Sequence, residues 1–255
     1  GAAPPIRALQ ALDALDAHLV REGDGLLLLL TPPFDRSAGD PGYIKGYVPG
    51  VRENGGQYTH GALWAIRAFA ETGRTDRAAH LLEMLSPITR TATPRDVERY
   101  GAEPYVVAAD VCALPPHTGR AGWTWYTGSA GWMFRVTLES VLGFAIEGGH
   151  TIVLRPCVPD SWKGFTIRYR LGDGSHCELR VHRAEPNAAP ITASCATATV
   201  TVEGGAVRVP LRADGRDRIV EVVLGRDAAP RYQPRGAGPD APSPSVAPRE
   251  RITSA

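Results

Sequence analysis

The spacing of the apolar residues changes at Gly148-Gly149, and this change constrains the fold more than any other feature of the sequence. Before the two glycines, large apolar residues recur every three or four positions, as in amphipathic helices. After them, apolar and polar residues alternate or β-branched residues form short runs, which is typical of strands. We therefore predict an α+β chain with a helical part followed by a β part.

Helical spacing is found in four segments separated by long loops, at residues 6–20, 58–72, 76–85 and 132–146. Residues 97–111 mix apolar and acidic side chains, and we interpret them as a further helix. Segments 58–72 and 76–85 are expected to form an αα-hairpin that turns at Gly73. Helices that alternate with long loops are typical of an α/α barrel whose loops build a site at one end. We accordingly expect residues 1–148 to be part of a helical catalytic domain.

The β part is predicted as an antiparallel sandwich over residues 149–226. Asp173-Gly174 and Gly204-Gly205 are suited to hairpin turns. The predicted strands are residues 151–154, 165–171, 177–182, 197–202, 206–211 and 218–224. Proline, glycine, arginine and serine dominate residues 227–255, so we expect a disordered tail there.

Composition excludes several classes of function. The formal net charge of +1 gives no strong field for nucleic acid or anionic lipid. Four cysteines without metal-ligand spacing predict reduced structural thiols, and neither a metal nor an organic cofactor is expected. The apolar run at residues 26–30 is too short to span a bilayer, and no basic and apolar leader precedes it. These features predict a cytoplasmic segment.

Two runs, at residues 51–60 and 122–132, combine charged residues, hydroxyls, glycines and indoles without the apolar period of a core element. A polar ligand explains this composition better than packing does. Indole and phenol rings offer flat faces to sugars, a carboxylate accepts hydrogen bonds from sugar hydroxyls, and glycines let backbone N–H groups approach an anion. A carbohydrate together with a phosphate would use all of these groups.

The runs at residues 42–50, 52–60, 103–111 and 122–132 resemble the inverting β-glycoside phosphorylases, the family of cellobiose and chitobiose phosphorylase. Within this family, the likeness is to the phosphorylase-like C-terminal region of cyclic β-1,2-glucan synthases, over roughly residues 5–225. The resemblance implies the C-terminal half of an (α/α)6 barrel followed by a β domain. It also implies inverting phosphorolysis of a β-glucan, β-1,2-linked, to α-glucose 1-phosphate, with chain-length control in the synthases.

The resemblance also implies roles for individual residues. It places His60, Thr127 and Gly128 against phosphate, where the hydroxyl of Ser129 is a further suitable donor. It places Glu53 against the acceptor-side glucose. Arg52 and Gln57 are expected beside Glu53, and Trp125 or Tyr126 is expected to stack on sugar. The ordinary alternatives are that His60 caps a helix, that residues 127–129 form a simple turn, that Arg52 and Glu53 are a solvated pair, and that the aromatic rings are core residues.

No catalytic residue is assigned in this chain, because the general acid that the resemblance implies is an aspartate further upstream than Gly1. The segment alone is expected to be inactive. The expected partners are a β-glucan oligosaccharide and inorganic phosphate as co-substrate, with no nucleic acid. The full-length form is expected to be a homodimer, or to be fused to a membrane-bound glycosyltransferase at the inner membrane. The alternatives are a non-catalytic carbohydrate-binding remnant and an α/α-barrel hydrolase, in which Glu103 or Asp110, on one face of a helix, would be the base.

Overall fold

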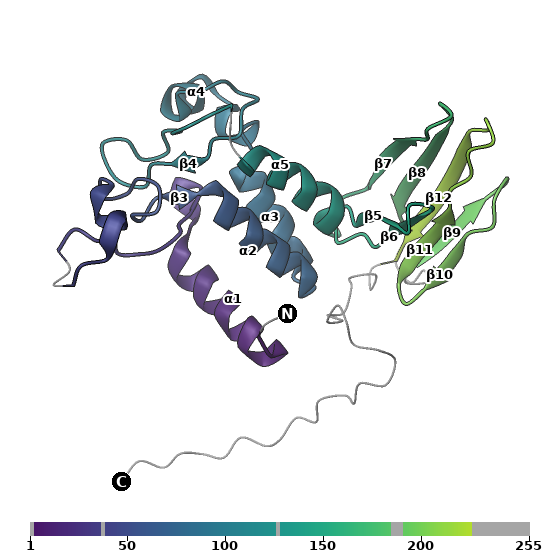
Figure 1. The fold of residues 1–255 in the computed structure, drawn as a ribbon, viewed down its shortest axis with the longest axis horizontal. Coiled ribbons are helices and arrows are strands. Elements are labelled where there is room, and N and C mark those ends of the chain that lie inside the picture. The colour runs from purple at the N-terminus through teal and green to yellow at the C-terminus, as the bar shows by residue number, and fades with distance from the viewer. Residues whose placement is uncertain (1–2, 37–38, 126–127, 185–190, 226–255) are drawn as a thin grey trace, which may run out of the picture.

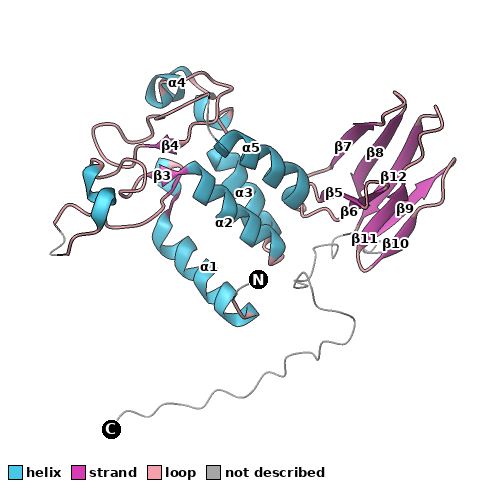
Figure 2. Cartoon of the chain, viewed as in Figure 1, coloured by secondary structure: helices cyan, strands magenta, loops and turns pink. Residues whose placement is uncertain are grey.

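A computed structural model of the chain describes residues 3–225 apart from 37–38, 126–127 and 185–190. The helical part precedes the β part in the chain, and the two parts lie beside each other (Figures 1 and 2). The α+β class predicted from the sequence is therefore confirmed. The predicted tail at residues 227–255 lies outside the described residues. None of the helices in the described ranges has the length and apolar character needed to cross a bilayer.

The helical part is built around α2. The α-helices are α1 (Pro5–Leu19), α2 (Thr59–Glu71), α3 (Thr75–Leu85), α4 (Pro94–Tyr100) and α5 (Gly128–Arg135), with 3-10 helices at Glu22–Asp24, Gly42–Gly46 and Thr89–Thr91. The predicted hairpin is confirmed as α2 and α3, which turn at Gly73. In the described part of the chain the helices do not close into a barrel (Figure 1).

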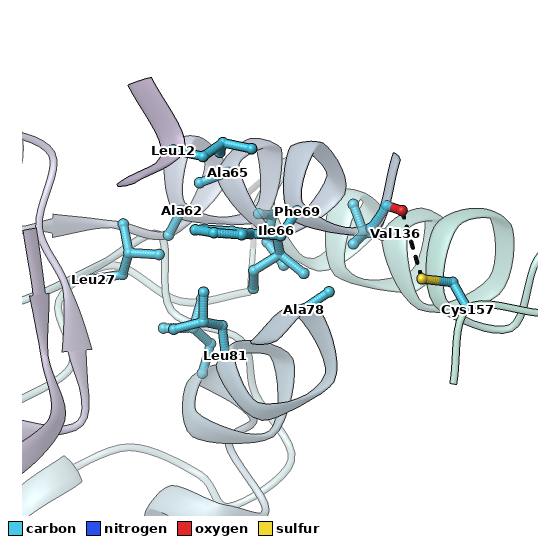
Figure 3. Close-up of a cluster of buried hydrophobic side chains, with 13 residues drawn as sticks. Leu12, Leu27, Ala62, Ala65, Ile66, Phe69, Ala78, Leu81, Val136 and Cys157 are labelled. Atoms are coloured by element: carbon cyan, nitrogen blue, oxygen red, sulfur yellow. Dashed lines mark hydrogen bonds between the residues drawn. The ribbon is translucent and has the colours of Figure 1, made fainter. Parts of the chain in front are cut away.

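Apolar residues at helical spacing explain why α2 is central. Leu63, Ile66 and Phe69 are fully buried, and Figure 3 shows their helix between Leu12 of α1 and Leu81 of α3. Burial of each such side chain contributes about 1.5–3 kcal/mol relative to its exposure. The same cluster holds the helices together and fixes the direction in which α2 presents its N-terminus.

The predicted helix at residues 97–111 is wrong over most of its length. The helix begins three residues earlier, because Thr93 accepts a hydrogen bond from the Asp96 backbone N–H at 3.2 Å and Pro94 occupies the first turn. It ends at Tyr100, because Gly101 takes the left-handed conformation with φ 63°. Residues 101–109 are irregular, and Asp110–Val111 form the short strand β4.

The predicted helix at residues 132–146 also ends too late. After α5 the chain continues as a π-helix at Val136–Val141, and Phe144–Glu147 is strand β5. Gly143, with φ 75°, stops the helix where it meets Arg155. A Cβ on Gly143 would lie 1.9 Å from the Arg155 carbonyl oxygen, so only glycine allows this approach.

The β part is a sandwich of two four-stranded sheets. The strands after β5 are β6 (Thr151–Leu154), β7 (Gly164–Arg170), β8 (His176–Arg183), β9 (Ile191–Cys195), β10 (Thr201–Glu203), β11 (Ala206–Pro210) and β12 (Arg218–Leu224). The sheet orders are β10-β11-β6-β5 and β7-β8-β12-β9. Apolar residues of both sheets, such as Ile152, Leu179, Val207 and Val220, form one buried cluster.

Two details of the β part differ from the prediction. The pairs are antiparallel except β8 with β12, which run parallel; the chain between them passes through β9 of the same sheet and then through β10 and β11 of the other sheet. The predicted strand at residues 197–202 is wrong over most of its length, because β9 ends before it at Cys195 and β10 begins only at Thr201, within its last two residues.

The apolar run that begins at Leu26 is buried in the helical part. Leu26–Leu27 form β2, which pairs with β1 (Val20–Arg21). Leu26 and Leu28 pack against Tyr100 and Val111 in a third core cluster. This cluster supports the loops that carry the candidate site.

Candidate functional site

Backbone hydrogen bonds join the runs that the sequence singled out. Strand β3 (Gln57–Tyr58) pairs with β4, and the Thr59 N–H donates to the Ala109 carbonyl at 2.9 Å. The Ala109 N–H in turn donates to the Trp123 carbonyl at 2.7 Å. Segments about fifty residues apart in sequence are therefore neighbours in one rigid layer next to the N-terminus of α2.

His60 lies in the first turn of α2 inside an aromatic cluster. Its ring centroid lies 4.6 Å from that of Trp64 and 5.4 Å from that of Trp132. Tyr58 stacks on its other side at 6.5 Å. The Nε2 atom is buried and has no hydrogen-bond partner among the described residues. Because the N-cap position of α2 is Tyr58 and no side chain caps it, the alternative that His60 is a helix cap is wrong.

The start of α5 lies against His60. A Cβ placed on Gly128 would lie 4.0 Å from Nδ1 of His60, and Ser129 is buried beside it. The predicted partners Thr127 and Tyr126 lie outside the described residues. The first turns of α2 and α5 therefore bring an imidazole and two sets of backbone N–H groups to one place, an arrangement that attracts anions.

Arg52 and Glu53 do not form the solvated pair that was the ordinary alternative. Arg52 Nε lies 3.7 Å from Oδ1 of buried Asp110, and its guanidinium stacks 3.9 Å from the Trp123 ring centroid. Glu53 has a buried Oε2 atom without a hydrogen-bond partner in the described structure. A buried carboxylate oxygen without a hydrogen-bond donor costs free energy of folding unless a ligand supplies the donor.

The loop that carries these residues is fixed from behind. Asn54, which is fully buried, accepts a hydrogen bond from the Phe34 N–H at 2.6 Å and donates to the Tyr47 carbonyl at 2.9 Å. Gly56 packs so closely against the loop that a Cβ there would lie 2.8 Å from the backbone nitrogen of Arg52. The Asn-Gly-Gly sequence thus folds the loop tightly and keeps Glu53 in place.

Gln57 lies inside the protein rather than on its surface. Its side chain is 1% exposed, and its amide oxygen accepts from the Leu27 N–H at 3.2 Å and from Arg90 Nη2 at 3.0 Å. Its Nε2 atom donates to Thr59 Oγ1 at 3.2 Å. The structure therefore gives Gln57 contacts within the protein, while direct contact with sugar remains a prediction.

Trp125 projects from the layer, with 67% of its surface exposed. Its indole Nε1 donates to Glu103 Oε1 at 2.9 Å, and Tyr105 meets its ring edge-on at a centroid distance of 6.0 Å. Trp125 and Arg52 are the two non-glycine residues with positive φ among those described, at 70° and 50°. Such a conformation costs about 1–2 kcal/mol per residue and is most often kept at functional sites.

Neither carboxylate considered for a hydrolase lies as predicted. Glu103 and Asp110 do not share a helix face, because residues 101–109 are irregular. Asp110 accepts from the Trp123 N–H at 3.3 Å and lies beside Arg52, so it supports the loop. Burial raises the pKa of Asp110, against the hydrogen bond from Trp123 and the charge of Arg52. The hydrogen bond from the Trp125 indole N–H lowers the pKa of Glu103.

Some residues of the site gave no clear signal in the sequence. Trp64 falls at ordinary helical spacing, yet it is exposed and contacts His60. Tyr105 sits in a segment that resembled a helix. The inward orientation of Arg90 has no signature in its local sequence. Only the aromatic character of Trp64 and Tyr105 could have suggested a role.

Comparison with known proteins finds a family match over the part of the chain that contains the candidate site. Residues 1–143 match the model of the glycosyl hydrolase 94 superfamily, catalytic domain. The chain is 43% identical over 185 residues to the cyclic β-(1,2)-glucan synthase NdvB of Rhizobium meliloti, which is 72% of this chain and 6% of the relative. It is 31% identical to an N,N'-diacetylchitobiose phosphorylase of Vibrio proteolyticus, over 88% of this chain and 27% of the relative.

A solabiose phosphorylase of Paenibacillus borealis is 32% identical over 87% of this chain and 28% of its own length. The chain thus spans little more than a quarter of these phosphorylases and a much smaller share of the synthase. The family match nevertheless covers more than half of the chain. The chain therefore belongs to the glycosyl hydrolase 94 superfamily.

Proposed function

We propose that the chain is the C-terminal part of a glycoside phosphorylase that cleaves a β-glucan with inorganic phosphate and inverts the configuration at the anomeric carbon. The observation that carries the proposal is the buried, unpartnered Nε2 atom of His60, whose other ring nitrogen, Nδ1, lies beside the first turn of α5. A buried imidazole nitrogen without a protein partner is accounted for by a ligand that hydrogen-bonds to it.

Phosphate suits this position chemically. It is already an anion, so it needs donors that hold it below the anomeric carbon rather than a base that activates it. His60 and the backbone N–H groups of Gly128 and Ser129 are such donors, with the Thr127 hydroxyl beside them in sequence. In the reaction, a phosphate oxygen bonds to the anomeric carbon while the glycosidic C–O bond breaks and a carboxylic acid protonates the leaving oxygen. The product is α-glucose 1-phosphate.

The exposed aromatic residues support a sugar subsite next to the phosphate. Trp125 and Tyr105 present rings at 75° to each other, and Glu103 fixes the indole. The unpartnered carboxylate oxygen of Glu53 would accept a hydrogen bond from a sugar hydroxyl. Aromatic faces with a few placed polar groups are the usual composition of a carbohydrate site.

We further propose that the helical part is the C-terminal half of an (α/α)6 barrel. Trp64 on α2, which contacts His60, and Phe134 on α5 expose 54% and 67% of their surfaces. Apolar side chains of this size are normally covered. The remaining helices of the barrel, which would also carry the general acid, would cover them. The small share of each relative that the chain spans supports this arrangement.

The glucan is proposed to be β-1,2-linked. This finer assignment is supported by the synthase relative, whose name specifies that linkage, and by its higher identity to this chain than that of the disaccharide phosphorylases. In such a protein the phosphorylase domain would shorten the glucan and so control its chain length.

The test measures phosphate consumption by the complete natural protein acting on β-1,2-glucan. We expect glucose 1-phosphate to form in step with phosphate loss. His60→Ala should raise the KM for phosphate about thirtyfold, equivalent to about 2 kcal/mol for one hydrogen bond to a charged group, with little change in the KM for glucan. Thr127→Ala should act in the same direction.

His150→Ala serves as the matched control, because His150 is an exposed histidine in the turn between β5 and β6. It should leave both KM values unchanged. Release of reducing sugar without sugar phosphate would refute the proposal and favour a hydrolase. Glucan binding without turnover would favour a binding remnant.

A further inference from the structure

Arg90 is an inward-facing cation without a counter-ion. It lies in the 3-10 helix Thr89–Thr91, and its guanidinium donates to the Gly25 carbonyl and to the Gln57 side chain. No carboxylate within the described ranges comes within 4.0 Å of it, and its Nε atom is buried without a partner. Burial lowers the pKa of Arg90 to about 10. A desolvated charge is costly, so its retention calls for an explanation.

The hydrogen bonds of Arg90 continue toward the candidate site. Gln57 accepts from Arg90 Nη2 at 3.0 Å and from the Leu27 N–H at 3.2 Å, and both donors require the amide oxygen to face them. The Nε2 atom of Gln57 must then face Thr59, to whose Oγ1 it donates at 3.2 Å. Thr59 is 2% exposed and precedes His60 in the first turn of α2.

We propose that Arg90 is a positioning residue that acts through Gln57 and Thr59 to hold the first turn of α2, and with it His60, in place for an oxyanion. The inference rests on the proposed function, because the oxyanion is phosphate. Arg90 does not itself touch the phosphate. Its charge polarises the amide of Gln57 so that the positive end of that group points toward the N-terminus of α2.

This orientation adds to the positive end of the α2 dipole. Because the relay is buried, solvent screens it much less than it screens a surface charge. The field favours a bound anion and has no corresponding effect on an uncharged sugar. Arg90 should therefore influence phosphate affinity selectively.

The experiment compares variants of the complete natural protein in steady-state phosphorolysis, with phosphate and β-1,2-glucan varied in turn. Arg90→Met should raise the KM for phosphate about tenfold and leave the KM for glucan within about twofold. Arg90→Lys, which keeps the charge, should recover most of the loss. Gln57→Glu should raise the phosphate KM by at least as much as Arg90→Met, because it places a negative charge on the relay.

Arg99→Met is the matched control. Arg99 and Arg90 line the same cavity of about 170 Å³, but Arg99 donates to the Thr118 and Asp24 carbonyls and makes no contact with Gln57. It should leave the phosphate KM unchanged. A purely structural role for Arg90 predicts a different result, in which Arg90→Met changes the KM for phosphate and the KM for glucan together.

The outcomes separate this inference from the proposed function. If the wild type uses phosphate but Arg90→Met leaves its KM unchanged, or Arg90→Lys is as impaired as Arg90→Met, the positioning role is wrong while the phosphorylase proposal stands. If the wild type cleaves glucan without consuming phosphate, both are wrong.

Discussion

Substitution of Gly122 by alanine tests whether Asp110 supports the candidate site. A Cβ on Gly122 would lie 2.4 Å from Oδ1 and 2.5 Å from Oδ2 of Asp110. Contacts this short cannot be kept, and the Asp110 side chain, only 5% exposed, has little room to move. The carboxylate must therefore leave its position or the segment must shift as a whole.

The magnitude follows from what the shift would break. Overpacking of a buried site costs about 1–3 kcal/mol. Loss of the bond from the Trp123 N–H to Asp110 adds about 1.5 kcal/mol, the lower end of the range for a charged acceptor, because the bond is long at 3.3 Å. We expect a total of about 3 kcal/mol, which lowers Tm by about 6–12 °C in a chain of this length.

Two measurements detect the loss of stability expected in Gly122→Ala. Thermal unfolding reports the overall destabilisation, and hydrogen exchange of the Trp123 amide reports the bond to Asp110 directly. Gly131→Ala is the control, because Gly131 lies within α5 and a Cβ there meets no atom within 4 Å. That variant should be as stable as the wild type or more stable by about 0.5–1 kcal/mol.

A double variant isolates the contact. With Asp110→Ala present, the alanine at position 122 has room, so the second substitution should cost much less than it does alone. If Gly122→Ala melts with the wild type and leaves Trp123 exchange unchanged, the proposed support by Asp110 is wrong.

Two further predictions concern the sugar subsite and the contact between the 3-10 helix Glu22–Asp24 and α3. Trp125→Ala should raise the KM for glucan about tenfold without changing the KM for phosphate in steady-state assays, because it removes a stacking face worth about 1–2 kcal/mol. The hydrogen bonds from His80 and Arg77 lower the pKa of Glu22 below its ordinary value of 4.5. The stability they contribute is therefore complete above pH 4.5 and is lost as the pH falls through the folded-state pKa, so urea titrations of Glu22→Gln and wild type should converge in acid.

The elements that could be predicted from the sequence were those with a complete local signal. Residues 58–72 and 76–85 carry an uninterrupted apolar period, and both helices formed within one or two residues of the predicted bounds. The prediction at residues 97–111 failed because it relied on composition and did not use the signals that mark the ends of the helix. These signals are Thr93-Pro94 at the start and Gly101 at the end. Gly143 likewise ends a helix through a backbone contact with Arg155, which lies twelve residues away and leaves no trace in the local period.

The candidate site was predictable as a set of residues but not as an arrangement. Composition singled out the run that holds His60, Arg52 and Glu53, because its mixture of charged, glycine and aromatic residues does not suit a core, and the family resemblance gave His60 and Glu53 their expected roles. Composition could not distinguish a side chain that would contact the ligand from one that only supports the site. Gln57 belongs to the same run as His60, yet its side chain is buried and hydrogen-bonded to Leu27, Arg90 and Thr59, partners that the local sequence does not reveal.

The burial of Gln57 also explains how a cation can lie close to the proposed anion site without entering it. The Gln57 side chain meets Arg90, and the chain then turns into α2, whose first turn carries His60. One short strand therefore separates the guanidinium of Arg90, which solvent screens weakly, from the turn where an anion would bind. A lysine or arginine in direct contact with the phosphate would attract it more strongly, but it would also occupy the phosphate oxygens. A charge held behind one amide can strengthen binding while leaving the phosphate oxygens free for reaction.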